Sequence, residues 1–432
     1  MSRTKRPGPL RAALGKLGIL LPGLGAVATT TMAGVFLARR GLARPTGSLT
    51  QLGKVQLGKR SCALSDVVPL ASLDDLEFGA WDIFPDDAFA AATHAGVLSP
   101  EHLELVRGEL ESVRPMEAAF YPQYVRRLLG PHAKFAATKA DMVEQLRADI
   151  RTFRRDHGCV RLVAVWCGST EIYLKPSAVH ESVRAFELGL LRNSPEISAS
   201  QLYGWACIKE GVPFANGAPN LTVDFPAAWE LARAHGVPLA GKDFKTGQTL
   251  LKTVLGPGLH ARALDLRGWY STNLLGNRDG EVLADPEAFR NKEASKLGVL
   301  EGLFDGAGAA DFVHQVRIDY YRPRGDAKEA WDSIDLTGWL GYPMQLKVNF
   351  LCRDSILAAP LVLDLALLLD LAQRAGLDGV QDWLGFYFKN PSRAADAPPE
   401  HDLFVQRRRL ESALRGLMAD GPSPRLNDGR HA

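Results

Sequence analysis

Apolar residues alternate between short continuous runs and helical spacing along the chain up to Gly241. Lys16–Leu21 is a short apolar run that predicts a buried strand, and Thr29–Arg39 follows it as a predicted helix. Met142–Asp156 places apolar residues at helical spacing and leads into Arg161–Trp166, an unbroken apolar run that is typical of a buried parallel strand. This alternation predicts an α/β fold built on a doubly wound sheet.

Beyond Gly241 the pattern changes. Up to Cys352 the chain is rich in turns, with one helix and with segments of alternating polarity such as Val313–Tyr321 and Gln345–Leu351. Alternation with a period of two is typical of strands that have one exposed face, so we expect antiparallel strands here. After Cys352 the pattern returns to that of the first part, which predicts that a different domain is inserted into the first one.

Two apolar segments have the hydropathy of a signal peptide or a membrane span. Leu17–Ala38 is uncharged and follows basic residues, but it consists largely of Gly, Ala and Thr. Ser355–Ala372 is more apolar and contains Pro360, Asp364 and Asp370. A buried strand that turns into a buried helix, and a buried core helix, produce the same hydropathy, and we favour these two interpretations.

The composition is that of an ordinary globular protein, with 46% hydrophobic and 23% charged residues among 432. Lys and Arg number 51 against 49 Asp and Glu, so the net charge of +2 argues against nucleic-acid binding through a broad basic surface. The five cysteines are scattered and form no CxxC pair. A disulfide framework or structural zinc site is therefore not expected, and a reducing, cytoplasmic compartment fits best.

The segment from Gly23 to Ala28 lies between the first predicted strand and helix and has the GxGxxA form of a dinucleotide-binding turn. Gly23 permits the tight turn, Gly25 lets the backbone approach a pyrophosphate, and Ala28 keeps the helix close to its strand. The alternative is a plain strand–helix turn, because glycine turns after strands are common. No acidic residue stands about 20 residues further on, where the ribose partner is usual. Asp82 is a candidate for that role, with helix capping as its alternative.

Two turn-rich segments combine hydrogen-bond donors, carboxylates and flexible backbone. They are Gly241–Thr249 and Leu275–Gly280. Their polar residues include Asp243, Thr246 and Gln248 in the first segment and Asn277, Arg278 and Asp279 in the second. Taken separately, each segment is better explained as a surface turn. Taken together, they are candidates for binding a polyhydroxylated ligand.

Asp285-Pro286 predicts the start of a helix, because Asp caps free amides and Pro fits the first helical position. Lys292 and Lys296 stand four residues apart on that helix and share a face. One interpretation is a solvated face. The other is a site for an anion, in which each ammonium lowers the pKa of the other and one lysine exchanges protons near neutral pH. Lys328 and Lys389 are further candidate anion ligands.

In their order along the chain, these segments resemble the motifs of the myo-inositol-1-phosphate synthase family. The motifs are G-x-D-x-K-[ST]-G-Q-T at Gly241–Thr249, L-G-N-x-D-G at Leu275–Gly280, F-R-x-K-E-x-S-K at Phe289–Lys296, G-D-[SA]-K at Gly325–Lys328, C-x-D-S at Cys352–Ser355 and EGVPFANGAP at Glu210–Pro219. The resemblance runs from about Leu17 to Asn390, which is nearly the whole chain.

The chain departs from the family pattern at three places. Ala26, Val27 and Ala28 stand where better-known members have an Asn-rich glycine loop. The segment Trp166–Glu171 replaces a W-x-A-N-T-E pattern, and Arg278 stands where Asn is usual. These differences affect the contacts to the pyrophosphate and ribose and leave the set of lysines unchanged.

The resemblance implies a Rossmann-type, doubly wound NAD-binding domain with an inserted α+β domain for catalysis and oligomerisation. The NAD-binding domain would comprise residues 16–242 and 353–419, and the insertion residues 243–352. A flexible basic arm at 1–15 and a disordered tail at 420–432 complete the expected organisation. The family is typically tetrameric through the insertion, which implies a homotetramer.

The resemblance also implies the reaction. NAD would stay tightly bound and be recycled while D-glucose 6-phosphate cyclises to 1L-myo-inositol 1-phosphate, also named the 3-phosphate, a step in inositol and phospholipid biosynthesis. C5 is oxidised, a C6 proton is lost, the enolate attacks C1 and the ketone is reduced again. A loop around Asp279–Lys292 is expected to order over the substrate, because the reactive intermediates must not leave.

The family positions imply roles for individual residues. Asp326 would orient a lysine, Asp354 would lie near the nicotinamide, and Lys389 would help to hold the phosphate. The implied catalytic residues are Lys292, Lys296, Lys328, Lys389 and Asp326. The implied cofactor-binding residues are Gly23, Leu24, Gly25, Ala26, Val27, Asp82, Gly168, Ser169, Thr170, Gly217, Asp243, Asp326, Asp354 and Ser355. The implied substrate-binding residues are Thr246, Gly247, Gln248, Asn277, Arg278, Asp279 and the four lysines.

Two alternative functions stay open at this point. One is an NAD-dependent sugar-phosphate dehydrogenase or reductase with net hydride transfer, which would release NADH. The other is an NAD-sensing or membrane-tethered scaffold built on residues 17–38, which leaves the later lysines unexplained. No histidine has metal-ligand spacing, and no metal site is predicted. Asp243, Asp279, Asp326 and Asp354 are nevertheless candidates for holding a monovalent or divalent cation.

Overall fold

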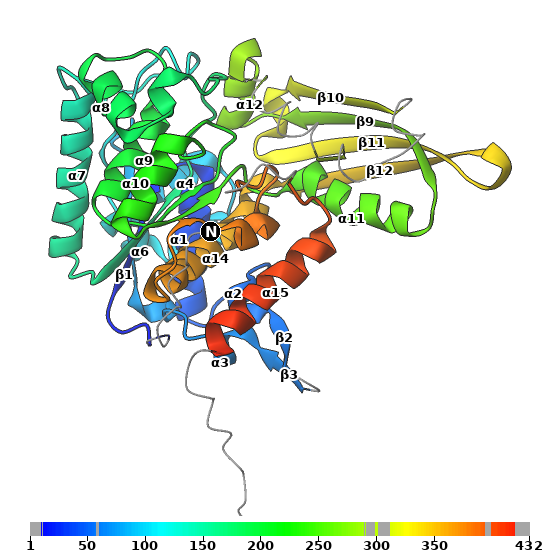
Figure 1. The fold of residues 1–432 in the computed structure, drawn as a ribbon, viewed down its shortest axis with the longest axis horizontal. Helices are drawn as coiled ribbons and strands as arrows, with labels where there is room; N and C mark the ends of the chain where they lie inside the picture. The colour runs from blue at the N-terminus through cyan, green and yellow to red at the C-terminus, as the bar shows by residue number, and fades with distance from the viewer. Residues whose placement is uncertain are drawn as a thin grey trace, which may run out of the picture.

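The computed structural model describes residues 10, 12–57, 60–288, 290, 299–300, 312–393 and 399–419. The expected tail at 420–432 and most of the expected arm at 1–15 lie outside these residues. Two sheets organise the described part of the chain, a large one on the left of Figure 1 and a small one at its upper right.

The large sheet has seven strands in the order β13-β8-β7-β6-β1-β4-β5. Its strands are β1 (Leu17–Pro22), β4 (Leu76–Asp82), β5 (Met116–Glu117), β6 (Arg161–Trp166), β7 (Phe214–Asn216), β8 (Pro238–Gly241) and β13 (Gly379–Val380). Every neighbouring pair is parallel. The predicted doubly wound α/β fold is confirmed, because helices connect these parallel strands and cover both faces.

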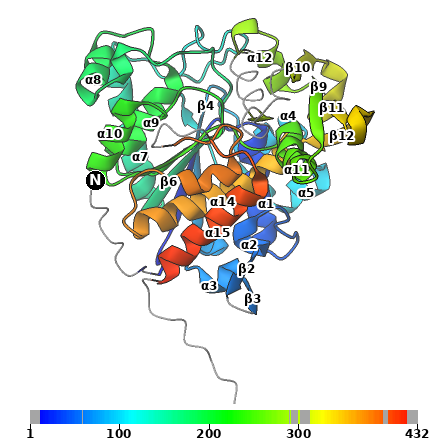
Figure 2. The same ribbon diagram turned by 45° about the vertical axis from the view of Figure 1, so that its right-hand side comes forward.

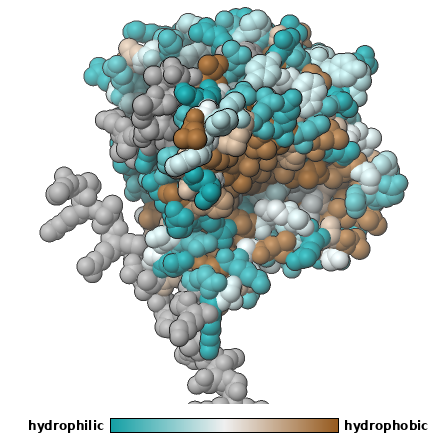
Figure 3. All heavy atoms as spheres, turned by 90° about the vertical axis from the view of Figure 1, so that its right-hand side faces the viewer, coloured by the Kyte–Doolittle hydropathy of each residue, from teal (hydrophilic) through white to brown (hydrophobic). Residues whose placement is uncertain are grey.

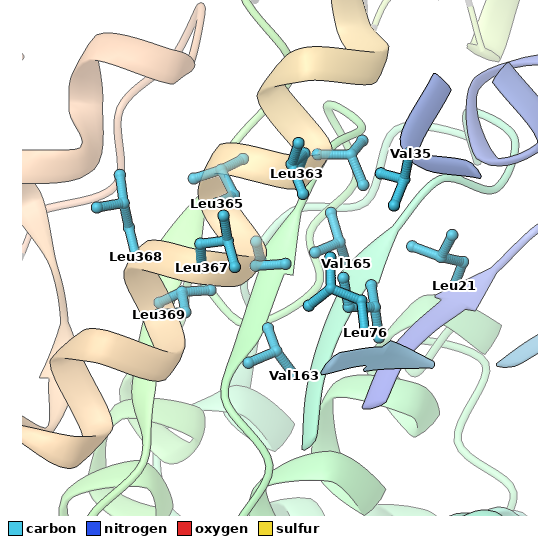
Figure 4. Close-up of a cluster of buried hydrophobic side chains, with 14 of the residues drawn as sticks. Leu21, Val35, Leu76, Val163, Val165, Leu363, Leu365, Leu367, Leu368 and Leu369 are labelled. Carbon is cyan, nitrogen blue, oxygen red and sulfur yellow. The ribbon is translucent and has the colours of Figure 1, made fainter. Parts of the chain in front are cut away.

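The helices on one face of the large sheet include α1 (Ala26–Arg39), α4 (Ala88–Ala95) and α14 (Asp354–Arg374), and those on the other face are α7 (Lys139–Asp156), α8 (Val183–Leu191), α9 (Ala199–Lys209) and α10 (Pro226–His235). Figures 1 and 2 show the green helices α7 to α10 on one side of the sheet and the orange α14 on the other. Alternate residues of β6 serve the two cores: Val163 and Val165 face α14, and Leu162 faces α7. Figure 4 shows leucines of α14 packed against Val163 and Val165.

The two apolar segments that have the hydropathy of a membrane span are elements of the protein core. Leu17–Ala38 forms β1 and most of α1, and most of its residues are buried. Among the described residues α14 is the one helix long and apolar enough to cross a membrane, but 78% of its apolar window is buried inside the protein. Its acids have partners: Asp364 accepts hydrogen bonds from Leu49 N at 2.7 Å and from Thr50 Oγ1 at 2.6 Å. Both segments are therefore buried in the core, as predicted.

The small sheet has the order β10-β9-β11-β12. Its strands are β9 (Asp265–Leu275), β10 (Val313–Tyr320), β11 (Ala327–Thr337) and β12 (Pro343–Arg353). Helix α11 (Gly247–Ala261) covers one face, where Leu255 and Leu259 pack against Trp269 and Ile334. The hairpin of β11 and β12 extends to the right edge of Figure 1.

The expectation of antiparallel strands is right for β12 and wrong for β10. β12 pairs antiparallel with β11, whereas β10 pairs parallel with β9. The reason lies in the connection. The chain leaves β9, passes through α12 (Arg278–Leu283) and returns to start β10 at the same end as β9. Such a crossover permits parallel pairing, whereas a tight turn imposes antiparallel pairing.

The other elements lie at the periphery. They are α2 (Leu49–Leu52), β2 (Lys54–Leu57), β3 (Arg60–Ala63), α3 (Leu64–Val67), η1 (Leu73–Asp75), α5 (Pro100–Leu105), α6 (Arg107–Ser112), η2 (Ala178–His180), η4 (Arg322–Arg324), η5 (Trp339–Gly341), η6 (Asp382–Tyr387) and α15 (Leu403–Ala419). The first five of these elements form an excursion between α1 and β4, although β4 lies directly beside β1. Helix α15 packs across η6 and α11.

Candidate active site

A cavity of about 530 Å³ lies between the carboxyl ends of the large-sheet strands and the nearest end of the small sheet. Parallel α/β sheets bind ligands at this edge, where the connections diverge to the two faces. Every residue predicted to contact NAD borders the cavity, as do Thr246, Asn277, Arg278, Lys328 and Lys389 from the predicted substrate set. The structure thus brings together residues from distant parts of the chain.

Five predicted residues are not placed on this wall. Gly247 and Gln248 stand just behind it, and Gln248 Nε2 donates to the carbonyl oxygens of Thr272 at 3.2 Å and Trp331 at 3.1 Å. Gln248 thereby ties α11 to two strands of the small sheet. Lys292 and Lys296 lie outside the described residues, as do the end of the expected closing loop and the side chain of Asp279.

The glycine loop after β1 has the shape that a dinucleotide needs. Gly23 has a φ of 95°, and a Cβ there would lie 2.5 Å from the Cα of Gly168. Only glycine fits this position, because the left-handed conformation and the close approach both exclude a side chain. Gly25 is different, since a Cβ there would meet no atom within 4 Å and would project into open space. The residues present therefore fit NAD, with space beside Gly25 at the start of α1 for the pyrophosphate.

Asp82 ends β4, the strand beside β1, which is the position from which an acidic residue binds the adenosine ribose in dinucleotide-binding sheets. Its carboxylate accepts hydrogen bonds from Leu24 N at 2.7 Å and Phe84 N at 3.0 Å. Burial raises the pKa of Asp82, and these amides and the charge of Arg278 partly offset that effect. The carboxylate holds the glycine loop to β4, and helix capping is not its role here.

Two further loops pack closely at the cavity wall. A Cβ at Gly217 would lie 2.2 Å from the ring of Phe244, and a Cβ at Gly168 would lie 2.8 Å from the ring of Trp166. The Gly217 N–H donates to the Trp166 carbonyl at 3.2 Å. The absence of side chains at both glycines lets these loops pack closely, and Gly168 lies directly against Gly23 of the glycine loop.

Glu171 is a cavity residue that the sequence reasoning did not select. It is buried and accepts hydrogen bonds from Ser198 Oγ at 2.6 Å and from Ser200 N at 2.9 Å. Burial raises its pKa, while these hydrogen bonds lower it. Its place directly after Thr170, in a segment already matched to a family pattern, was the signal available in the sequence.

Lys389 and Asp243 form a buried pair on the cavity wall. The Lys389 Nζ atom lies 3.1 Å from Asp243 Oδ1. Asp243 follows β8 with a φ of 63°, and Lys389 follows η6. The backbone N–H of Lys389 also donates to the Asp243 carbonyl at 2.7 Å. Two backbone segments that are remote in sequence thus present one ammonium group to the cavity.

A second pair joins the small sheet to α14. The Lys328 Nζ atom lies 2.8 Å from Asp354 Oδ2, and Lys328 is buried. Gly247 lies against this pair, since a Cβ there would be 3.0 Å from Lys328 Nζ. The small residue at position 247 therefore leaves room for the lysine.

Asp326 lies between the two sheets and has an incomplete set of partners. Its Oδ1 atom accepts from Asn277 Nδ2 at 2.9 Å and from Ser355 Oγ at 3.2 Å. Its buried Oδ2 atom has no hydrogen-bond partner in the described part of the chain. Burial raises the pKa of Asp326, and the two hydrogen bonds oppose this effect. An unpartnered buried oxygen at a cavity wall is suited to a hydroxyl or N–H group of a ligand.

Lys245 belongs to the same motif as Asp243 but points to another part of the protein. It does not border the cavity, and its ammonium donates to Gln406 of α15 and lies 5.8 Å from the Phe386 ring centroid. Burial lowers the pKa of Lys245 to about 7. The motif from Gly241 to Thr249 thus serves the cavity and also anchors the last helix.

Across the described residues, no three His, Cys, Asp or Glu side chains are grouped so that they could hold a metal ion. The cavity lining contains two ammonium groups, two guanidinium groups, seven carboxylates and exposed backbone, which together offer cationic groups for a phosphate and hydrogen-bond partners for many hydroxyl groups.

The family model described as myo-inositol-1-phosphate synthase matches residues 17–415. The inositol-3-phosphate synthase 1 of Bacteroides thetaiotaomicron is 51% identical over 418 residues, which cover 95% of this chain and 97% of that protein. The inositol-3-phosphate synthase 1 of Homo sapiens is 34% identical, with 94% of this chain and 79% of that protein covered. The crystal structure of inositol-3-phosphate synthase from Caenorhabditis elegans aligns with a TM-score of 0.87 at 28% identity and covers 96% of this chain and 88% of that chain.

Proposed function

The chain belongs to the myo-inositol-1-phosphate synthase family, as its motifs predicted, and on this premise we propose its reaction. It converts D-glucose 6-phosphate into 1L-myo-inositol 1-phosphate, which is also named the 3-phosphate. Substrate and product are isomers, so the protein is an isomerase that uses NAD without consuming it. A redox-neutral cycle requires that cofactor and sugar phosphate share one enclosed site.

One observation carries this proposal: a single cavity of about 530 Å³ is bordered both by the dinucleotide-binding glycine loop and by Lys328 and Lys389. The glycine loop comes from the large sheet and Lys328 from the small sheet. A cofactor and a phosphorylated sugar can therefore lie against each other in it. Such proximity is what a hydride transfer that is later reversed in place requires.

When bound, NAD oxidises C5 of the substrate and, as NADH, reduces the same carbon at the end of the cycle. The ketone at C5 acidifies the proton on C6, and the resulting enolate attacks the C1 aldehyde. Negative charge develops on the C5 oxygen, and we assign its stabilisation to the Lys328 ammonium, which borders the cavity. Asp354, at 2.8 Å, holds that lysine in position.

Lys389, held by Asp243, supplies a second fixed positive charge, and we assign it to the phosphate group. Asp326 orients the polar groups between the sheets through Asn277 and Ser355. Lys292 and Lys296 are assigned by family position alone to proton transfer and oxyanion stabilisation. The family position also supports a loop around residues 279–292 that closes over the substrate.

The test is incubation of the protein with glucose 6-phosphate and a catalytic amount of NAD, followed by phosphorus NMR and by absorbance at the NADH band. We expect inositol phosphate in amounts well above the NAD supplied, with no accumulation of NADH. Release of NADH in proportion to substrate consumed would instead establish the alternative, a sugar-phosphate dehydrogenase. The scaffold alternative predicts no change in the substrate.

We further propose the domain division that the motifs suggested. Residues 16–242 and 353–419 form the NAD-binding domain, and residues 243–352 form the inserted catalytic domain. The large and small sheets support this division, because strands β1 to β8 and β13 belong to one sheet except for the β2–β3 hairpin, and β9 to β12 belong to the other. All five cysteines are free thiols, which supports a cytoplasmic location.

We propose a homotetramer that assembles through the small sheet. The face of this sheet opposite α11 exposes Tyr270 and Trp331, each 43% exposed, together with Leu351. The turn between β11 and β12 exposes Trp339 and Leu340. Figure 3, which faces the end of the molecule where this sheet lies, shows a contiguous hydrophobic area surrounded by hydrophilic residues. Large exposed apolar areas of this kind support a protein–protein interface.

A further inference from the structure

Arg278 extends from the connection between β9 and β10 to the strand that carries Asp82. It is the first residue of α12, and its Cζ atom lies 4.4 Å from the centroid of the Phe84 ring. Phe84 follows Asp82 by two residues, and its backbone N–H is bound to the Asp82 carboxylate. Arg278 therefore stands beside the position of the adenosine ribose, at one end of the cavity.

Packing on both sides fixes the backbone of this segment. Val282 and Ala288 are buried against Val125, which belongs to the loop after β5. On the other side, Asn277 caps α12 through its bond with Gly280 N at 3.1 Å and donates to Asp326 at 2.9 Å. Arg278 is itself exposed, so this packing fixes the point from which its side chain extends, and the Phe84 ring supports the guanidinium at the cavity.

The glycine loop has few groups with which to hold a dinucleotide. The side chains of Leu24, Ala26 and Val27 carry no polar atoms. The backbone N–H of Leu24 is already bound to Asp82 at 2.7 Å. Backbone amides at the start of α1 remain, but the first turn of that helix supplies no charged side chain.

Arg278 has the groups that the loop lacks. Its guanidinium borders the same cavity and has no hydrogen-bond acceptor among the described residues. Stacking of one guanidinium face on Phe84 leaves five N–H donors for other partners. A guanidinium binds phosphate oxygens in a bidentate manner, which an ammonium cannot do.

We propose that Arg278 binds the adenosine monophosphate half of NAD, and not the sugar-phosphate substrate, and so holds the cofactor in the site between turnovers. This inference rests on the NAD binding of the proposed function. It moves Arg278 from the substrate-binding set expected from family position to the cofactor. Asp82 and Arg278 then hold the adenosine end together, Asp82 from the end of β4 and Arg278 from the start of α12.

The test is calorimetric titration of the full-length, nucleotide-free protein with NAD and with ADP-ribose, which keeps the adenosine half and lacks the nicotinamide. Arg278→Ala is compared with Arg278→Lys and with the control Arg107→Ala. Arg107 is an exposed arginine whose Cζ atom lies 3.9 Å from the Phe89 ring centroid, and it does not border the cavity. We expect Arg278→Ala to weaken both ligands by about ten- to hundredfold, because a charge-assisted contact is lost. Arg278→Lys keeps the charge and loses the planar group, so we expect an intermediate loss, and Arg107→Ala should match the wild type.

The outcomes separate this inference from the proposed function. A wild-type protein that binds no NAD overturns the proposed function. Wild-type binding of NAD together with binding by Arg278→Ala within twofold of it overturns the role of Arg278 alone. A loss for NAD with unchanged affinity for ADP-ribose places the residue at the nicotinamide or substrate end and also overturns the inference. Should Arg278→Ala fail to fold by circular dichroism, Arg278→Lys decides, and its affinity within twofold of the wild type counts against the role.

Discussion

Lys389 and Asp243 lie 3.1 Å apart, and their side chains are only 4% and 2% exposed. Asp243 follows β8, the last large-sheet strand before the small sheet, and Lys389 follows η6, near the end of the described chain. Their pairing joins two remote segments of the large-sheet region at the cavity wall. Removing either partner of such a buried ion pair leaves the other as an uncompensated buried charge, which destabilises the fold.

Lys389→Ala should raise KM for glucose 6-phosphate more than it lowers kcat, because a phosphate contact acts in the ground state and the transition state alike. It should also destabilise the protein by about 3–5 kcal/mol, since Asp243 is left as a buried unpaired charge. Steady-state kinetics and urea unfolding measure the two effects. The double variant with Asp243→Asn should recover part of the stability and none of the affinity, and recovery of both would refute the role in binding phosphate.

Gly25→Val should abolish NAD binding while the protein stays folded. The valine side chain would enter the open space beside the start of α1, where the pyrophosphate is expected, and it would meet no protein atom within 4 Å. Calorimetry with NAD and a thermal melt without it are the measurements. Gly34→Ala on the same helix is the control, because a Cβ there also meets no atom and does not face the cavity. NAD binding by Gly25→Val within threefold of the wild type would contradict the assignment of this loop.

Lys328→Met should lower kcat by about 10²–10³ and leave NAD binding intact, because one fixed positive charge at the developing oxyanion is lost. Lys175→Met is the matched control, since Lys175 is exposed and lies off the cavity wall. Single-turnover rates and NAD titrations distinguish the two variants. The same loss is expected for Lys292→Ala from its family position. Kinetics of Lys328→Met within twofold of the wild type would remove Lys328 from the catalytic set.

Lys245→Met should be compared with the wild type over a range of pH. Burial lowers the pKa of Lys245 to about 7 in the folded protein, against 10.5 for an ordinary lysine. Above pH 7 the folded state therefore releases a proton that the unfolded chain keeps, so the free energy of unfolding of the wild type rises with pH in this window. Relative to Lys245→Met, the wild type should gain about 2–3 kcal/mol between pH 6 and pH 9. Parallel curves in urea unfolding would show that Lys245 stays charged throughout.

Trp331→Arg should break the proposed assembly of the small sheets and leave the monomer folded. The side chain is 43% exposed on the face opposite α11, and its replacement puts a charge in the middle of the apolar area. Light scattering after gel filtration should show a mass below that of a tetramer. Phe135→Arg is the control, because Phe135 is 89% exposed and lies outside the small sheet. An unchanged mass for Trp331→Arg, or a monomeric wild type, would refute this interface.

The strands and the cofactor loop were the most predictable parts of the structure. The unbroken apolar run Arg161–Trp166 coincides with β6, because a central parallel strand is buried on both faces and tolerates no other pattern. Gly23 was also identifiable, since its φ and its contact with Gly168 admit no side chain. The apolar run and the φ of Gly23 are local constraints and are therefore visible in the sequence, whereas the contact of Gly23 with Gly168 appears only in the fold.

Features that depend on distant segments were not predictable in the same way. Asp82 stands 58 residues after Leu24, its hydrogen-bond partner, because the β2–β3 excursion separates two adjacent strands. The direction of β10 depends on the crossover through α12, which its own alternating pattern does not reveal. Lys245 has the same motif spacing as its cavity neighbours, and only the position of α15 shows that it points away.

The register of helix α14 determines where the side chains of its first turn lie at the cavity. Its leucines specify that the helix is buried, but a row of similar leucines fits the sheet almost equally well after a slip of one turn, about 5.4 Å along the axis. Asp364, bound to Leu49 and Thr50, and Asp370, bound to Arg161 at 2.7 Å, are buried acids that would lose these hydrogen bonds after such a slip. The two buried acids therefore fix the register of this apolar helix against the sheet. They thereby determine the position along the helix axis at which Asp354, in the first turn, pairs with Lys328.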